Sequence, residues 1–215
     1  MLQLLVLAGI AVFLILKLRS VLGTREGFEK PPVPRDDPAP QTRRDFEVIE
    51  GGVDRDITDH VPEGSPSAKA LAAMKKAEPS FQVGPFLQGA RGAYEMILMA
   101  FEKGELDRIR PFLSDDVEAS FTEVIADRES KGLTIDATFV GLKEMALQEA
   151  HFDTNSGFGE ITVRFVGELT SAVRDKAGEI VEGDSKTVKR QRDVWTFARK
   201  MGASDPNWQL VATGD

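Results

Sequence analysis

The spacing of apolar residues changes at Gly132, and this change restricts the possible folds more than any other feature of the sequence. Before Gly132 the apolar positions repeat with a helical period, and after it they alternate. We predict helices at 86–101, 105–113 and 114–132, followed by strands at 133–139, 144–152, 161–173, 186–199 and 208–212. Helices followed by strands are typical of an α+β fold in which about three helices pack on one face of a curved antiparallel sheet.

Glycines and polar clusters separate these predicted elements. Gly104 and Gly132 are placed to end helices, and the polar runs 153–157 and 175–178 to form turns between strands. In the third helix the apolar stripe, which includes Val124, is expected to face inward.

The first 22 residues form a different kind of segment. Residues 2–16 are apolar except for one glutamine, which predicts a transmembrane anchor over residues 1–22. A cleaved signal peptide is the alternative, but no basic residue precedes the apolar run, and Lys17 and Arg19 stand where cleavage would be needed. These two residues and Arg25 place the C-terminal domain in the cytoplasm and the N-terminus outside. We therefore expect a single-pass protein of the cell inner membrane.

Two further segments connect the anchor to the domain. Residues 23–65 hold six of the eleven prolines and show no apolar period, so we predict a disordered linker that leaves His60 solvated. Residues 66–79 predict a basic amphipathic lead-in helix, capped by Ser67 and burying Leu71 and Met74. Its lysines are candidate contacts for anionic lipid: Lys69, Lys75 and Lys76. The alternative is a lead-in helix packed on the folded domain, which we place at 80–215.

The amino-acid composition excludes several kinds of functional site. The chain has no cysteine, only two histidines and a formal net charge of -8. Thiolate chemistry and an all-histidine metal centre are therefore excluded, and nucleic acid is an unfavourable partner. The sequence contains no phosphate-binding loop and no nucleophile elbow. We expect no cofactor, no metal site and no enzymatic activity.

The residues that could line a ligand pocket lie in the predicted helices and strands. Tyr94, the only tyrosine, is either a core ring with a satisfied hydroxyl group or a hydrogen-bond donor in a pocket between helix and sheet. Gly89 and Gly92 lie in the same predicted helix, where we attribute them to close packing. Trp195 is expected to be buried centrally. The candidate pocket-lining residues are Tyr94, Leu98, Phe121, Leu169, Trp195 and Phe197.

Three stretches resemble a known family. Residues 86–121 (FLQGARGAYEMILMAFEKGELDRIRPFLSDDVEASF), 188–200 (VKRQRDVWTFARK) and 204–215 (SDPNWQLVATGD) resemble the Tim44-like family, which comprises a peripheral subunit of the mitochondrial inner-membrane import translocase and its bacterial relatives. The resemblance extends from Phe81 to the end of the chain.

The resemblance implies an NTF2-like, cystatin-like cone with an antiparallel sheet around an apolar pocket. It also implies a non-enzymatic adaptor that binds translocase or chaperone-related proteins at a membrane and contacts anionic lipid. Two alternatives remain open. One is an NTF2-like pocket domain that binds or converts a small apolar ligand, and the other is a membrane-tethered oligomerisation domain.

Overall fold

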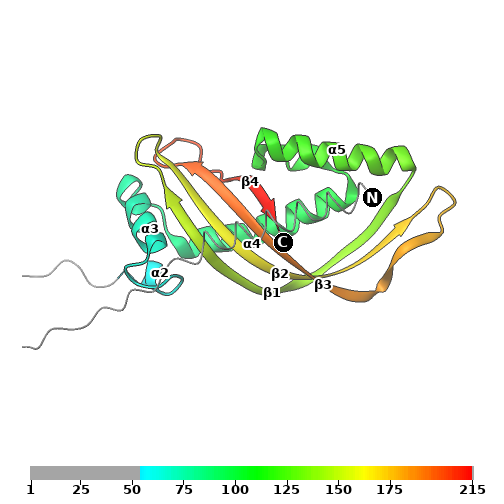
Figure 1. Cartoon of the computed structure of the whole chain (residues 1–215), viewed down its shortest axis with the longest axis horizontal. Helices are drawn as coiled ribbons and strands as arrows, with labels where there is room; N and C mark the ends of the chain where they lie inside the picture. Colours follow the sequence, from blue (N-terminus) through cyan, green and yellow to red (C-terminus); the bar gives the residue numbers. More distant parts are fainter. Residues whose placement is uncertain (1–53, 215) are drawn as a thin grey trace, which may run out of the picture. The chain divides into compact units, whose positions relative to one another are not determined.

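The computed structural model describes residues 54–214. The predicted anchor at 1–22 and the predicted linker up to residue 53 lie outside the described residues. Within 54–214, no helix is both long enough and apolar enough to cross a bilayer. The predicted α+β class is confirmed, because helical segments come first and four antiparallel strands follow in the order β1-β2-β3-β4 (Figure 1).

The described residues contain six helical segments and four strands. The helical segments are α2 (Arg55–Thr58), α3 (Pro66–Ala77), α4 (Val83–Lys103), the 3₁₀ turns η1 (Leu106–Arg108) and η2 (Arg110–Phe112), and α5 (Asp115–Lys131). The strands are β1 (Thr134–Phe152), β2 (Phe158–Arg174), β3 (Ile180–Lys200) and β4 (Gln209–Gly214).

Two of the predicted boundaries are wrong. The short helix predicted at 105–113, which Pro111 was expected to kink or end, is instead the two turns η1 and η2, because Pro111 has no N–H to donate and interrupts a regular helix. The strands predicted at 133–139 and 144–152 are one strand, β1. Bulges near Gly141 and Glu144 shift its register against β2 without ending the pairing.

The centre of the core is a contact between α4 and the sheet, which curves around this helix (Figure 1). The ring of Tyr94 stacks on Phe165 with 4.5 Å between centroids and lies 4.8 Å from Trp195. Tyr94 and Phe165 are completely buried, and Trp195 is 4% exposed. Gly167 makes this approach possible, since a Cβ atom there would lie 2.8 Å from the tyrosine hydroxyl oxygen.

The prediction of disorder is wrong for residues 54–65. Ile57 in α2 and Val61 after it are buried against the core. Asp56 caps α4, because its carboxylate accepts hydrogen bonds from the amides of Val83 (2.8 Å) and Gly84 (2.9 Å). These amides at the helix N-terminus have no partner within the helix, so a carboxylate there stabilises α4.

The predicted lead-in helix is α3, and it packs on β1. Leu71 and Met74 are completely buried, as their spacing predicts. Ser65 rather than Ser67 is the N-cap, accepting a 3.1 Å hydrogen bond from the amide of Ala68. Ser67 instead accepts a 3.1 Å hydrogen bond from the amide of Ala150 in β1, and so satisfies a donor of that strand.

Helix α5 makes a thinner contact than its sequence suggests. Val117 and Ile125 are buried, but Val124 is 44% exposed, so the prediction that it faces inward is wrong. Phe121 is half-buried and lies 4.4 Å from Phe101 of α4, measured between ring centroids.

Candidate binding pocket

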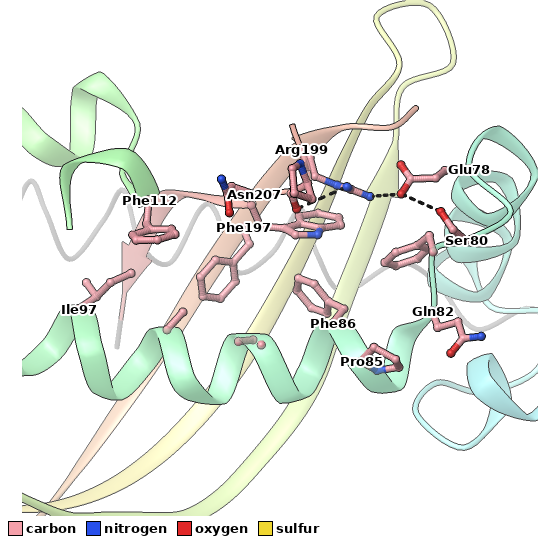
Figure 2. A pocket seen from close by; sticks show the side chains of 16 residues that line it. Glu78, Ser80, Gln82, Pro85, Phe86, Ile97, Phe112, Phe197, Arg199 and Asn207 are labelled. Atoms are coloured by element: carbon pink, nitrogen blue, oxygen red, sulfur yellow. Dashed lines mark hydrogen bonds and ion pairs between the residues drawn. The ribbon is translucent and has the colours of Figure 1, made fainter. Parts of the chain in front are cut away.

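An open pocket of about 470 Å³ lies between the N-terminal half of α4, η2, the end of β3 and residues 206–208 before β4 (Figure 2). Five aromatic rings line it: Phe81, Phe86, Phe112, Phe197 and Trp208. Four of these rings contact one another, all except that of Phe112, with 4.7 Å between the centroids of Phe86 and Trp208 and 6.1 Å between those of Phe86 and Phe197. We call this site the aromatic pocket.

Small residues of α4 leave room for the aromatic pocket. Gly89, Ala90 and Ala93 are among the α4 residues that line it. A Cβ atom at Gly89 would meet no heavy atom within 4 Å, and the same holds at Gly92. The attribution of these two glycines to close packing is therefore wrong, because both border open space.

An ion pair closes one end of the aromatic pocket. Arg199 of β3 donates a 2.7 Å hydrogen bond from Nη2 to Glu78 Oε1 (Figure 2). Glu78 Oε2 accepts a 2.8 Å hydrogen bond from the amide of Gly202. The guanidinium lies 5.2 Å from the ring centroid of Trp208. Burial raises the pKa of Glu78, but the amide of Gly202 and the charge of Arg199 outweigh it and hold that pKa below the ordinary 4.5.

The positive charge of Arg199 is therefore neutralised within the fold by the carboxylate of Glu78. It is 8% exposed, and its Nε atom has no hydrogen-bond partner among the described residues. The aromatic pocket thus offers apolar rings along its length and a neutralised ion pair at one end. This chemistry suits an apolar ligand or an apolar side chain of a protein.

Of the six residues predicted to line a pocket, only Phe197 does so. Tyr94, Leu98, Leu169 and Trp195 are buried in the core, where their rings and side chains fill the concave side of the sheet. Phe121 lies on α5, outside the lining. The pocket lies nearer the α3 end of the sheet than predicted.

The three lysines predicted to contact lipid have different surroundings. Lys75 Nζ lies 2.7 Å from Asp54 Oδ2 and 3.0 Å from Asp56 Oδ2, so its charge is paired within the fold. Lys69 and Lys76 are exposed on α3.

The main lining residues that the sequence did not reveal are Phe81, Phe86, Phe112 and Trp208. Phe81 and Trp208 lie outside the helices and strands, and Phe112 ends η2, so periodicity gives little information about which way these three side chains face. Phe86 lies in the first turn of α4 and shares a helical face with Ala90 and Ile97, but periodicity does not tell a pocket from a packed core. One available signal was the set of four small residues at 89, 90, 92 and 93, interrupted by Arg91, in a helix otherwise rich in large apolar side chains.

The fold and the pocket together define an α+β domain with a curved antiparallel sheet around one central helix and an aromatic pocket at one end. The chain belongs to the Tim44-like domain family, whose model matches residues 67–215.

Two individual proteins are similar to this chain, one in sequence and one in structure. The human mitochondrial import inner membrane translocase subunit TIM44 is 23% identical over 147 residues, which cover 67% of this chain and 32% of that protein. The chain thus spans about a third of the length of this curated relative. The intermembrane space region of the chloroplast protein ARC6 aligns with a TM-score of 0.42 and 12% identity, over 60% of this chain and 94% of that structure.

Proposed function

We propose that this protein is a non-enzymatic adaptor that holds a translocase or chaperone-related partner by an apolar segment seated in the aromatic pocket. The observation that carries the proposal is the pocket itself, in which five rings surround an open volume of about 470 Å³. Aromatic pockets that receive an apolar anchor supply much of the binding energy of protein interfaces. The human relative is named as a subunit of an import translocase, which supports a partner that works at a membrane.

The proposal also includes a membrane anchor in the N-terminal segment. Residues 1–22 anchor the chain in the cell inner membrane, and the domain lies on the cytoplasmic side. Confinement beside the membrane raises the effective concentration of the domain toward other membrane-bound proteins. An alkaline phosphatase fused to the C-terminus should be inactive, since this reporter requires an environment outside the cytoplasm.

Two substitutions in α4 provide a matched test of the pocket. Gly89→Leu places a side chain in the aromatic pocket, whereas Gly92→Leu places one in a groove lined by Met96 and Met99. Both replace a helical glycine, so both should stabilise α4 by a similar amount, up to about 1 kcal/mol. Only Gly89→Leu fills the proposed binding site.

The readout is comparative capture from detergent-solubilised membranes with the full chain as bait. We expect proteins that are retained by the wild type and by Gly92→Leu but lost with Gly89→Leu. The same set of proteins retained by both variants would show that the partner does not use the pocket.

Anionic lipid is a second element of the proposal, and it rests on Lys69 and Lys76 rather than on Lys75. Exposed basic residues near a membrane gain about 1 kcal/mol each from anionic headgroups, and salt weakens this gain. Binding to vesicles containing phosphatidylserine should therefore fall with salt and with Lys69→Gln/Lys76→Gln. Vesicle binding unchanged by this double variant would remove lipid contact from the proposal.

A small apolar ligand in the aromatic pocket is the second candidate function, because the volume and lining suit one. Conversion of such a ligand has less support, since Tyr94 lies in the core and not in the pocket lining. Native mass spectrometry of the purified full chain separates the two functions. A bound small molecule that disappears in Gly89→Leu would favour the ligand-binding function.

A further inference from the structure

The two edges of the sheet are protected to different extents. On the β1 edge, α3 packs against the strand and Ser67 accepts the amide hydrogen of Ala150. On the other edge, β4 pairs with β3 only from Val194 to Ala198. Figure 1 shows β4 beside one end of β3 only, with the rest of β3 extending away from it.

The unpaired part of β3 includes a regular stretch at residues 189–193. These five residues pair in register with β2, from Lys189 opposite Leu169 to Asp193 opposite Phe165. Within residues 54–214, no strand pairs with them on the other side. Backbone donors and acceptors on that side are therefore available to an added strand. We call residues 189–193 the edge slot.

The edge slot is basic in a chain whose formal net charge is -8. Arg190 shares one carboxylate, Glu168, with Lys143, at 3.1 Å and 3.3 Å, so two positive charges face one negative charge. Lys189 and Arg192 form no ion pair with the described residues. The slot thus carries three basic residues against one acidic residue, Asp193, along an open backbone.

The alternation of side chains sets where a partner must carry its charges. Tyr94 contacts Asp193 on the concave face, so Arg190 and Arg192 point to the opposite, convex face. Residues directly opposite each other on adjacent strands share a face. A strand in the edge slot would therefore place acidic residues two positions apart against Arg190 and Arg192.

We propose that the edge slot binds an extended acidic segment of a partner protein, which adds a fifth strand to the sheet beside β3. The charges disfavour a second copy of this chain as occupant, since antiparallel pairing of two slots would set like charges opposite each other. This site is separate from the aromatic pocket and does not depend on the function proposed for it.

The test uses the full chain and a fluorescent synthetic peptide in which glutamate alternates with valine. A second peptide has the same sequence but carries N-methyl groups on alternate amides, which removes hydrogen-bond donors and keeps the charge. We expect the N-methylated peptide to bind at least tenfold more weakly, and the unmodified peptide to slow amide exchange in residues 189–193. Equal binding of the two peptides, or no protection in the slot, would overturn the proposal.

A pair of variants tests the charge separately. Arg190→Gln/Arg192→Gln should weaken binding of the unmodified peptide at least tenfold, whereas the control Arg55→Gln/Arg91→Gln, with the same loss of charge on exposed helical positions, should change it less than twofold. Equal weakening by both variants would mean general electrostatic attraction and contradict the proposal. A dimer in sedimentation that dissociates in the Arg190→Gln/Arg192→Gln variant would identify a second copy as occupant and also contradict it.

Discussion

The hydroxyl group of Tyr94 donates a 2.6 Å hydrogen bond to Oδ2 of Asp193, and this bond joins the middle of α4 to β3 across 99 positions of sequence. Asp193 also accepts from the side-chain amide of Gln191 at 3.0 Å. Burial, and after it the neighbouring carboxylate, raises the pKa of Tyr94 above its ordinary value. The phenol therefore remains a neutral donor at physiological pH, and its role is to fix the central helix against the sheet.

Removal of this hydroxyl should destabilise the domain. Tyr94→Phe leaves Asp193 with one donor fewer, and hydrogen bonds to charged groups contribute about 1.5–3 kcal/mol. We expect a loss of that size in the free energy of unfolding, measured with urea. The added cost of Asp193→Asn should be smaller in the Tyr94→Phe background than in the wild type, because the paired donor is already absent. Additive effects would show that the bond contributes little.

Substitution of one tryptophan should mainly reduce stability, whereas substitution of the other should mainly reduce partner binding. Trp195 is 4% exposed in the core, so Trp195→Ala should cost about 3–5 kcal/mol. Trp208 is half-buried at the aromatic pocket, so Trp208→Ala should cost less stability and yet weaken partner capture. Thermal unfolding and comparative capture measure the two effects. Equal shifts in melting temperature would contradict this assignment of core and pocket.

Much of the fold could be predicted because its signals are local. Gly104 and Gly132 end α4 and α5 in the left-handed conformation, as their positions predicted. Asp175 accepts hydrogen bonds from the amides of Ala177 and Glu179 in the β2–β3 turn. The side chain that stabilises this turn lies within the turn itself, so the turn could be predicted from its local sequence.

The missed features depend on contacts between distant residues. Nothing near Gln82 signals a helix cap, because the capping carboxylate comes from Asp56, 27 positions before Val83. The aromatic pocket likewise joins Phe81 and Phe86 to Trp208 from the other end of the chain. Periodicity reports which face of an element is apolar, but not which distant residue completes a site.

Limited proteolysis should yield a core that begins near Asp54. A core that began between residues 66 and 85, as expected if residues 54–65 were disordered, would contradict the packing of Ile57 and Val61. Mass spectrometry of the first resistant fragment identifies its N-terminus. Ile57→Asp should shift that terminus toward Ser65, because a charge at a buried position detaches α2.

Acid should weaken the capping of α4. Burial raises the pKa of Asp56, but the amides of Gly84 and Val83 and the ammonium of Lys75 outweigh it, so that pKa lies below the ordinary 3.8. The unfolded chain then binds more protons than the folded one, and this contribution is present above about pH 4 and is lost as pH falls through the folded value.

Urea unfolding between about pH 3 and 7 measures this effect. Asp56→Asn should be less stable than the wild type near neutrality, and the two curves should converge at the acid end as the wild-type carboxylate takes up its proton. Parallel curves across the whole range would show that the charge of Asp56 does not stabilise the fold.

The capping of α4 by Asp56 also has a mechanical consequence. Residues 1–53 join the domain at Asp54, two positions before the carboxylate that holds the start of the central helix. Tension applied through the N-terminal segment therefore acts first on the ion pair between Asp54 and Lys75 and then on the hydrogen bonds from the amides of Val83 and Gly84 to Asp56. In a pulling experiment the first rupture should be the release of α2, at a force that Asp56→Asn lowers, while β1 to β4 remain paired.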